Sequence, residues 1–150
     1  MKIKLKRICK ENYKEILDLH VGKGQEGFIE TTEECLDEAK ELSLWRPVGI
    51  YNDDILVGFA MYGLFKEEGE FGRVWLDRFM IGCDYQGKGY GRASLKVLIS
   101  ELYDEYNYNE IYLSIYDDNK NAIKLYEDTG FYFNGELDIN GEKVMVKKIR

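Results

Sequence analysis

The chain has 150 residues, of which 45% are hydrophobic and 33% are charged, a balance typical of a single folded domain over residues 1–150. No apolar segment approaches the roughly 20 residues needed to cross a bilayer, so we expect a cytoplasmic protein without a membrane partner. The net charge of −7 argues against a nucleic-acid partner, whose phosphates most of this surface would repel, but would suit a cationic ligand.

The first third of the chain is predicted to be mostly helical after one short strand. Residues 2–6 alternate polar and apolar side chains, which indicates a half-buried strand. Asn12 can cap a first helix, and a glycine-bearing break follows at 22–27. Residues 31–34 read Thr-Thr-Glu-Glu, a capping box that would open a second helix reaching about residue 42.

The middle of the chain is rich in β-forming residues. Segments 48–51, 55–64 and 73–81 are each typical of a strand, and Asn-Asp-Asp at 52–54 indicates a hairpin turn between the first two. These three segments predict an antiparallel meander.

A glycine-rich loop precedes the next helix. Residues 86–91 read Gln-Gly-Lys-Gly-Tyr-Gly, followed by an amphipathic run over residues 92–106 and a strand at 110–116. This is the order of a βαβ unit, so the last strand should run parallel to its predecessor. The glycines could simply make a tight connection, or the loop amides and the positive helix end could bind a phosphate.

The C-terminal part predicts a helix and a hairpin. Asp118 or Asn119 can cap the helix, and Gly130 can end it. Strands at 131–137 and 142–149 follow, joined through an Asn-Gly turn. The chain is therefore predicted to be an α+β domain with a central, mixed, mostly antiparallel sheet of about seven strands flanked by about four helices.

Two motifs resemble the paired signature of the GNAT superfamily of acetyl-CoA-dependent N-acetyltransferases. Residues 86–91 carry Gln-x-x-Gly-x-Gly, and residues 119–131 carry Asn-x-x-Ala-x-x-Leu-Tyr-x-x-x-Gly-Phe. The order of the expected elements is also that of this superfamily, whose sheet splays in the middle. A narrower resemblance, to bacterial spermine/spermidine (diamine) N-acetyltransferases, rests on four segments: 45–49, 57–63, 72–79 and 134–138.

The resemblance implies an acetyl-CoA site around the glycine loop. The pantetheine arm would lie where strands 73–81 and 111–116 splay, and one backbone N–H there could polarise the thioester carbonyl. Asn119 would contact coenzyme A, although it could also be an ordinary helix N-cap, or do both. The expected pyrophosphate-binding residues are Gln86, Gly87, Lys88, Gly89, Tyr90, Gly91 and Arg92, and those beside the pantetheine are Phe79, Met80 and Ile81.

Tyr126 matches the tyrosine that protonates the leaving thiolate in the superfamily. A phenol with a pKa of about 10 is close enough in acidity to a thiol of about 8.5 to do so. The alternative is an ordinary core tyrosine, because the chain has 12 tyrosines. The position of Tyr126 in the motif favours the catalytic role.

The attacking amine must lose a proton, because an alkylammonium has a pKa of about 10.4. Asp77 is the first candidate to accept it, since strand alternation would place Asp77 on one face between Trp75 and Phe79. Asp77 could be a base directly or through water, or an anchor for a distal ammonium. The alternative is an ion pair with Arg73 or Arg78, although alternation would point Arg78 to the opposite face.

A polyamine site needs carboxylates for the ammonium groups and aromatic walls for the methylenes. Glu30 and Glu34 lie at the start of the second helix, which in the superfamily lies over the acceptor side. Acidic residues there also complement the helix dipole, an alternative that covers Glu34 better than Glu30. The candidate walls are Trp45, Trp75 and Tyr62, and further acidic candidates near the final hairpin are Glu136 and Asp138.

The sequence contains no predicted metal site. The cysteines Cys9, Cys35 and Cys83 are odd in number and lack Cys-x-x-Cys spacing, and His20 is the only histidine. We therefore expect free thiols. Cys83 has no evident base partner, so direct transfer is preferred to an acyl-enzyme route.

Together these features predict transfer of an acetyl group from acetyl-CoA to a primary amine of spermidine or spermine in a ternary complex, with coenzyme A as product. The same scaffold could acetylate a protein N-terminus, a lysine or an aminoglycoside, or could only sense acetyl-CoA. The resemblance and the two C-terminal strands are compatible with a homodimer without requiring one.

Overall fold

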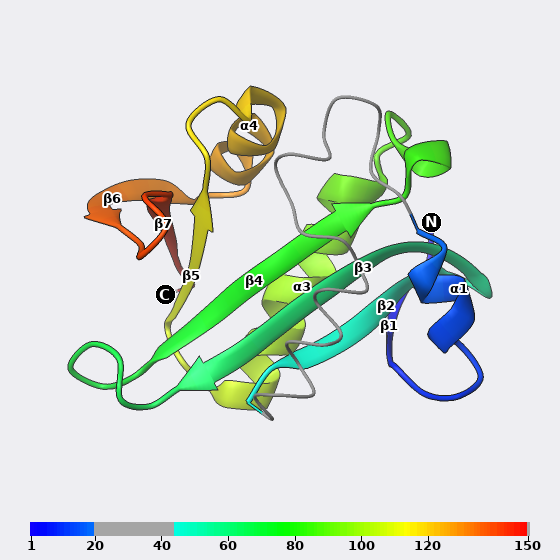
Figure 1. The fold of residues 1–150 in the computed structure, drawn as a ribbon, viewed down its shortest axis with the longest axis horizontal. Helices are drawn as coiled ribbons and strands as arrows, with labels where there is room; N and C mark the ends of the chain where they lie inside the picture. The colour runs from blue at the N-terminus through cyan, green and yellow to red at the C-terminus, as the bar shows by residue number, and fades with distance from the viewer. Residues whose placement is uncertain (20–43, 150) are drawn as a thin grey trace.

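The structure is a computed structural model that describes residues 1–19 and 44–149. Seven strands form one sheet in the order β1-β2-β3-β4-β5-β7-β6 (Figure 1). The strands are β1 (Ile3–Arg7), β2 (Arg46–Asn52), β3 (Ile55–Phe65), β4 (Arg73–Ile81), β5 (Glu110–Ile115), β6 (Tyr132–Leu137) and β7 (Lys143–Lys148). The described helices are α1 (Tyr13–Leu17), the short 3-10 helix η2 (Cys83–Tyr85), α3 (Tyr90–Tyr106) and α4 (Lys120–Asp128).

The predicted mixed sheet is confirmed. β4 and β5 pair in parallel, and the other neighbouring strands pair antiparallel. The crossover through α3 explains the parallel pair, because a βαβ connection returns the chain in the same direction. The second helix expected over residues 31 to 42 lies outside the described residues.

The central feature of the sheet is the divergence of β4 and β5. The two strands pair only through Val74 with Ile111 and Trp75 with Tyr112. Beyond these pairs β4 runs on to Ile81, and Figure 1 shows the strands separating. The expected splay is therefore present.

A β-bulge interrupts β4 beside this divergence. Tyr62 of β3 faces Leu76, but its neighbour Met61 faces Arg78, so Asp77 has no opposite residue on β3. An extra residue of this kind resets the alternation of side chains between the two faces of the sheet.

The bulge corrects the predicted placement around Asp77. Leu76 packs in the core on the α3 side, which puts Trp75 on the other face. After the bulge, Phe79 packs on the α3 side and Met80 on the α1 side. Trp75 and Phe79 therefore lie on opposite faces, and the expectation that they flank Asp77 on one face is wrong.

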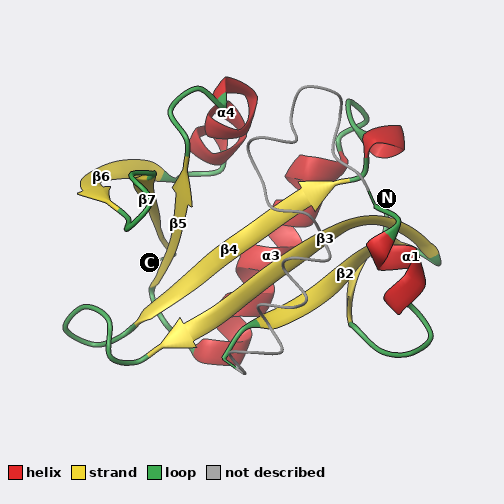
Figure 2. Ribbon diagram, in the orientation of Figure 1, coloured by secondary structure: helices red, strands yellow, loops and turns green. Residues whose placement is uncertain are grey.

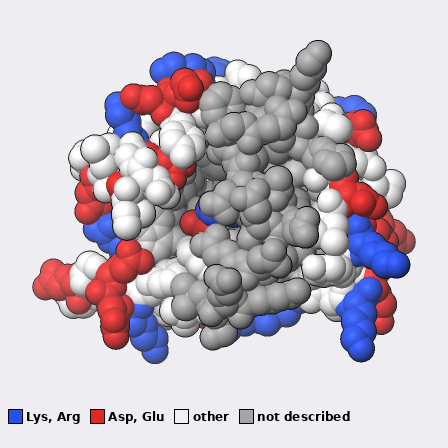
Figure 3. Space-filling model, in the orientation of Figure 1, with Lys and Arg blue, Asp and Glu red and all other residues white. Residues whose placement is uncertain are grey.

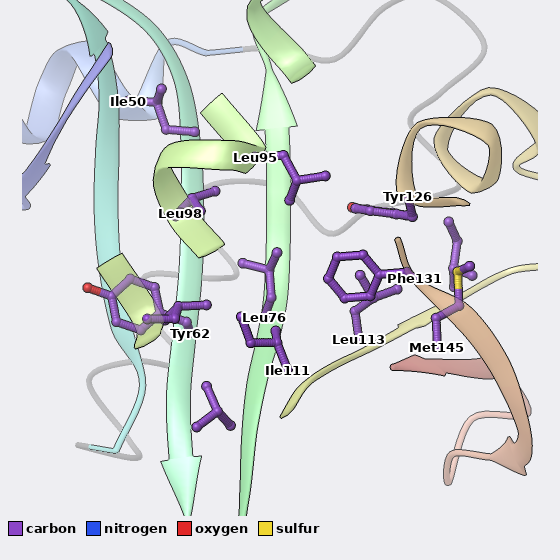
Figure 4. Close-up of a cluster of buried hydrophobic side chains, with 14 of the residues drawn as sticks. Ile50, Tyr62, Leu76, Leu95, Leu98, Ile111, Leu113, Tyr126, Phe131 and Met145 are labelled. Carbon is purple, nitrogen blue, oxygen red and sulfur yellow. The ribbon is translucent and has the colours of Figure 1, made fainter. Parts of the chain in front are cut away.

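Hydrophobic cores cover both faces of the sheet. The larger core fills the space between the sheet, α3 and α4. Figure 2 shows α3 lying across the sheet, and Figure 4 shows Leu95 and Leu98 of this helix in the core. Leu95, Leu98 and Leu102 are almost completely buried. Burial of a leucine side chain contributes about 1.5–3 kcal/mol, so this face of α3 fixes the helix to the sheet. A smaller core around Ile16 and Phe59 lies on the other face with α1.

None of the helices in the described ranges is long and apolar enough to cross a membrane. On the face shown in Figure 3, the described acidic and basic side chains are interspersed, and the described Lys and Arg residues do not form one continuous patch. The expectation that nucleic acid is not a partner stays a prediction.

Candidate active site

The glycine loop joins η2 to the N-terminus of α3. Gly87 and Gly89 have φ values of +74° and +88°, in the left-handed region that favours glycine. A Cβ on Gly87 would meet nothing within 4 Å, and one on Gly89 would meet only Met1 Cε at 3.9 Å. Backbone conformation, not close packing, therefore requires these glycines, and the space in front of them is open on the described side.

Side-chain contacts hold the loop in place. Gln86 Nε2 donates to the carbonyl oxygen of Ile81 at 2.9 Å, which ties the loop to the end of β4. Lys88 Nζ donates to the carbonyl oxygen of Asp84 at 3.1 Å. The Tyr90 hydroxyl accepts a hydrogen bond from Asn52 Nδ2 at 3.2 Å. The start of α3 is thus anchored to β2 and β4.

The start of α3 also faces α4. A Cβ on Gly91 would lie 3.4 Å from Leu125 Cδ2, an ordinary van der Waals contact, so this position lies directly beside α4. Arg92 Nη2 pairs with Asp128 Oδ2 at 3.1 Å. The first amides of α3 have no acceptors within the helix, as at every helix N-terminus, and are available to an anion.

Asn119 occupies the N-cap position of α4, but its side chain makes no capping hydrogen bond. Only its backbone carbonyl takes part in the helix, by accepting from the Ile123 N–H at 3.1 Å. The alternative of an ordinary side-chain cap is therefore not realised. The ligand role of Asn119 stays a prediction.

Tyr126 lies on α4 beside the divergence of β4 and β5. Its side chain is buried, and its ring centroid lies 6.5 Å from that of Phe79 and 5.6 Å from that of Phe131. Figure 4 shows the ring extending from α4 toward β4. Burial raises the pKa of Tyr126 above its ordinary value, so the phenol keeps its proton at neutral pH.

The edge of β4 beside Tyr126 is not paired with β5. Phe79, Met80 and Ile81 follow the last β4–β5 pair, so β5 does not use their backbone groups. The opposite edge of these residues is paired with β3. The structure thus places the expected pantetheine-binding residues along the edge of β4 that does not pair with β5.

Asp77 and Arg78 form an ion pair at the bulge. Arg78 Nη1 contacts Asp77 Oδ2 and donates to the Asp77 carbonyl oxygen at 3.0 Å. Both side chains are largely buried, with exposed fractions of 20% for Asp77 and 15% for Arg78. The expectation that Arg78 points to the opposite face is wrong, because the bulge breaks the alternation on which it rested.

An aromatic wall lies where β4 and β5 pair, on the face opposite α3. The rings of Trp75 and Tyr112 have centroids 5.5 Å apart, and the Arg73 guanidinium lies 4.3 Å from the Tyr112 centroid. Trp75 Nε1 donates to Glu68 Oε2 at 2.9 Å. Arg73 makes two contacts of 2.9 Å with Glu136. Glu136, one of the acidic candidates for binding a polyamine, is therefore already paired with an arginine.

Of the other two candidate wall residues, Trp45 lies on the same face of the sheet as Trp75, and Tyr62 lies on the opposite face. Trp45 packs against Phe65, with centroids 4.6 Å apart, on the α1 face. Tyr62 packs against Tyr106 of α3 in the larger core. Tyr62 is therefore excluded as part of a wall shared with Trp75. Glu30 and Glu34 lie outside the described residues, as do His20 and Cys35.

Three residues beside the divergence are not among the predicted site residues: Tyr112, Ser114 and Glu142. Tyr112 and Ser114 could have been found, because they alternate along β5 with buried Leu113 and Ile115. Glu142 could not, because no motif marks it. Ser114 Oγ donates to Glu142 Oε2 at 3.5 Å.

Glu142 and Asp138 form a carboxyl pair. Burial, followed by the hydrogen bond and negative charge of Asp138, raises the pKa of Glu142 to about 7. Burial alone would raise the pKa of Asp138, but hydrogen bonds from Glu142 and from backbone N–H groups lower it. Asp138 Oδ1 accepts from the N–H groups of Asn140 and Glu142, each at 2.9 Å.

The described residues contain no group of three or more side chains that could hold a metal ion. Cys9 and Cys83 are free and exposed.

The comparisons with known proteins identify the family. The model of the "Acetyltransferase (GNAT) family" matches residues 9–131. The chain is 53% identical over 152 residues to the "Spermine/spermidine N(1)-acetyltransferase" of Bacillus subtilis (strain 168), covering 99% of this chain and 100% of that relative.

Solved structures with a similar fold include the spermidine N-acetyltransferase from Vibrio cholerae in complex with CoA and spermine. It has a TM-score of 0.73 and 21% identity, covering 97% of this chain and 95% of that one. An aminoglycoside acetyltransferase in complex with coenzyme A has a TM-score of 0.81 and 17% identity, covering 98% and 95%. Both likenesses show the fold alone. The chain belongs to the GNAT acetyltransferase family.

Proposed function

We propose that this chain transfers an acetyl group from acetyl-CoA to a primary amine of spermidine or spermine. The observation that carries the proposal is the 53% identity, over essentially the whole of both chains, to the Bacillus subtilis spermine/spermidine N(1)-acetyltransferase. Fold similarity cannot choose the amine, because the aminoglycoside enzyme superposes better than the spermidine enzyme.

The donor side follows from the open glycine loop. Acetyl-CoA would place its pyrophosphate against the amides that begin at Gly87, near the positive end of α3. Lys88 and Arg92 would add positive potential, and Asn119 would contribute its uncommitted amide side chain. The pantetheine arm would then run along residues 79–81, on the edge of β4 that does not pair with β5.

Transfer needs polarisation of the thioester and a proton for the leaving thiolate. A backbone N–H on the edge of β4 that does not pair with β5 would stabilise the oxyanion that forms as the amine attacks. Tyr126 keeps its proton because it is buried, and it projects toward the same edge. It is therefore a protonated phenol at neutral pH, placed to give its proton to the thiolate and to recover one from the new amide nitrogen.

The acceptor would approach from the face that carries Trp75 and Tyr112. Their rings can contact the methylene groups, and the carboxylates of this face can pair with the ammonium groups. Asp77 stands at the bulge of β4, two residues after the last β4–β5 pair, and is paired with Arg78. Trp45 on the α1 face, and Glu30 and Glu34, stay proposed substrate residues.

The test is release of the coenzyme A thiol across a panel of amines. We expect spermidine and spermine to be turned over with higher kcat/KM than an N-terminal peptide, a lysine peptide or an aminoglycoside. Higher kcat/KM with one of the other amines would replace the polyamine proposal. Binding of acetyl-CoA without turnover of any amine would point to a sensor.

A homodimer is a further part of the proposal. β6 lies at the edge of the sheet, and it and the turn after it expose Tyr132, Phe133, Leu137 and Ile139. Apolar side chains on an edge strand favour association with another chain. Sedimentation at several concentrations should give a dimer that Ile139→Asp weakens, whereas a monomer at all concentrations would contradict it. The cytoplasmic location stays a prediction.

A further inference from the structure

Glu142 stands immediately before β7, beside the part of β5 that does not pair with β4. Lys143, the next residue, pairs with Ile115, and Ser114 Oγ contacts the Glu142 carboxylate. Ser114 alternates with Leu113 and Ile115, which face the core shared with α3 and α4. Glu142 therefore lies on the opposite face, the one from which the acceptor would approach.

Glu142 also interacts electrostatically with two residues of β4. Both the positive charge of Arg78 and the negative charge of Asp77 act on its carboxyl group. The groups that surround Glu142 thus come from three elements: Asp77 and Arg78 on β4, Ser114 on β5, and Asp138 at the turn between β6 and β7. Its sequence neighbour Lys143 points its ammonium elsewhere, to Asp117 Oδ1 at 3.0 Å.

The two carboxyl groups of the hairpin are in different states. Two backbone N–H groups donate to Asp138 and stabilise its ionised form. When the pair of carboxyl groups binds one proton, that proton is therefore on Glu142. Pairs of carboxyl groups whose pKa values are driven apart are typical of acid–base catalysis at neutral pH. A carboxyl with a pKa near 7 is a stronger base than an ordinary glutamate, and is still ionised in a large fraction of molecules at neutral pH.

We propose that Glu142 is a catalytic residue, the group that accepts the proton of the attacking ammonium, and that Asp138 is its positioning residue. This inference rests on the proposed acetyltransferase function. It explains why Asp77, which is held by Arg78, does not have to serve as the base.

The proton balance is complete. An N–H bond of the ammonium breaks, an O–H bond forms on Glu142, and the nitrogen keeps the electron pair with which it attacks the thioester carbonyl. The carbon–sulfur bond then breaks, the thiolate takes the Tyr126 proton, and Tyr126 takes the second proton from the nitrogen. Glu142 releases its proton to water, so each turnover yields the amide, coenzyme A and one proton.

The test is the pH dependence of kcat/KM for the amine that the wild-type enzyme turns over. We expect kcat/KM to rise with pH, with the ascending limb of the pH profile centred near pH 7, because Glu142 must be ionised before it can accept a proton. Glu142→Gln should lower kcat by about 10²-fold or more and remove this limb. Asp104→Asn, which removes an exposed carboxylate of α3, is the matched control and should change neither kcat nor the pH profile.

Asp138→Asn gives a readout that a structural role would not move. Asparagine keeps the Oδ1 acceptor for the two backbone N–H groups but removes the charge that raises the Glu142 pKa. The limb should therefore move to lower pH. Carboxyl carbon chemical shifts measured by NMR should show Glu142 titrating near pH 7 in the wild-type protein.

Several outcomes would overturn the inference. These are a folded Glu142→Gln enzyme with wild-type kcat and limb, a limb that Asp138→Asn does not shift, or a Glu142 carboxyl that titrates near 4.3, the ordinary value for glutamate. Turnover of another amine but not polyamines would sink the polyamine proposal while still testing Glu142. If no amine is turned over, both proposals fail.

Discussion

Arg73 of β4 and Glu136 of β6 form a two-point ion pair, although β5 and β7 lie between their strands in the sheet. The contacts are Nη1 to Oε2 and Nη2 to Oε1, both at 2.9 Å. The C-terminal strands must therefore curl back toward β4. This ion pair lies at the end where β4 and β5 pair, so the divergence is closed at that end and opens toward Ile81.

Glu136→Gln should lower the free energy of unfolding by at most about 1 kcal/mol, because the pair is partly exposed. Arg73 holds the pKa of Glu136 below its ordinary value, so this contribution is present above about pH 4.3 and is lost as the pH falls through the lowered pKa. Urea denaturation at several pH values measures it. Glu67→Gln, at an exposed position, is the control. A stability difference that persists unchanged at pH 3 would contradict the role of the ion pair.

Tyr126→Phe should lower kcat by about 10²-fold or more while leaving coenzyme A affinity largely unchanged. The ring keeps its packing against Phe79 and Phe131, and only the proton donor is lost. Steady-state thiol release and calorimetric binding measure the two effects separately. Tyr132→Phe, at an exposed tyrosine of β6, should have no effect on either. Undiminished turnover by Tyr126→Phe would remove Tyr126 from the mechanism.

Gly89→Ala should weaken coenzyme A binding roughly tenfold. The cost of placing alanine at a φ of +88° is about 1–2 kcal/mol, and the loop can avoid it only by changing shape. Gly135→Ala is a matched control, because Gly135 has a φ of +91° and a Cβ there would also meet open space. It should lower stability without changing coenzyme A affinity, which calorimetry can show. If both variants bind coenzyme A with equal affinity, the glycine loop does not contribute to coenzyme A binding.

Asp77→Asn, compared with a double variant, tests whether Asp77 contacts the substrate or only neutralises the charge of Arg78. Without its partner, the Arg78 charge would repel an ammonium substrate, so we expect KM for spermidine to rise. The double variant Asp77→Asn with Arg78→Gln removes both charges. Recovery of KM in the double variant would mean that Asp77 only neutralises Arg78. A KM that stays raised would mean that Asp77 contacts the substrate.

The strands, the glycine loop and the helices around it were predictable because their signals are local. Alternation and turn residues mark the meander, and the Asn-Gly pair marks the final hairpin. The helix after the loop begins at Tyr90, two residues before the predicted start at Arg92. This difference is small because the glycines mark the boundary themselves.

The surroundings of Asp77 were not predictable, because they depend on pairing between strands. A bulge is defined by the partner strand, so the residues of β4 alone cannot reveal that alternation resets between Leu76 and Arg78. Tyr62 was misassigned for a related reason, since nothing in its own segment tells which face α3 covers. Glu142 gains its raised pKa from Asp138 and from burial, and both depend on how the hairpin folds against β5.

The proposed donor and acceptor sites are tested together by a crystal structure of the protein with coenzyme A and spermine bound. We predict the pyrophosphate against the amides near Gly87 and Gly89 and the pantetheine between β4 and β5. A primary nitrogen of spermine should lie on the face of Trp75 and Glu142, with the position of the thioester carbonyl about 3–3.5 Å away. Coenzyme A bound away from the glycine loop, or spermine bound on the α3 face, would contradict the proposed arrangement of the site.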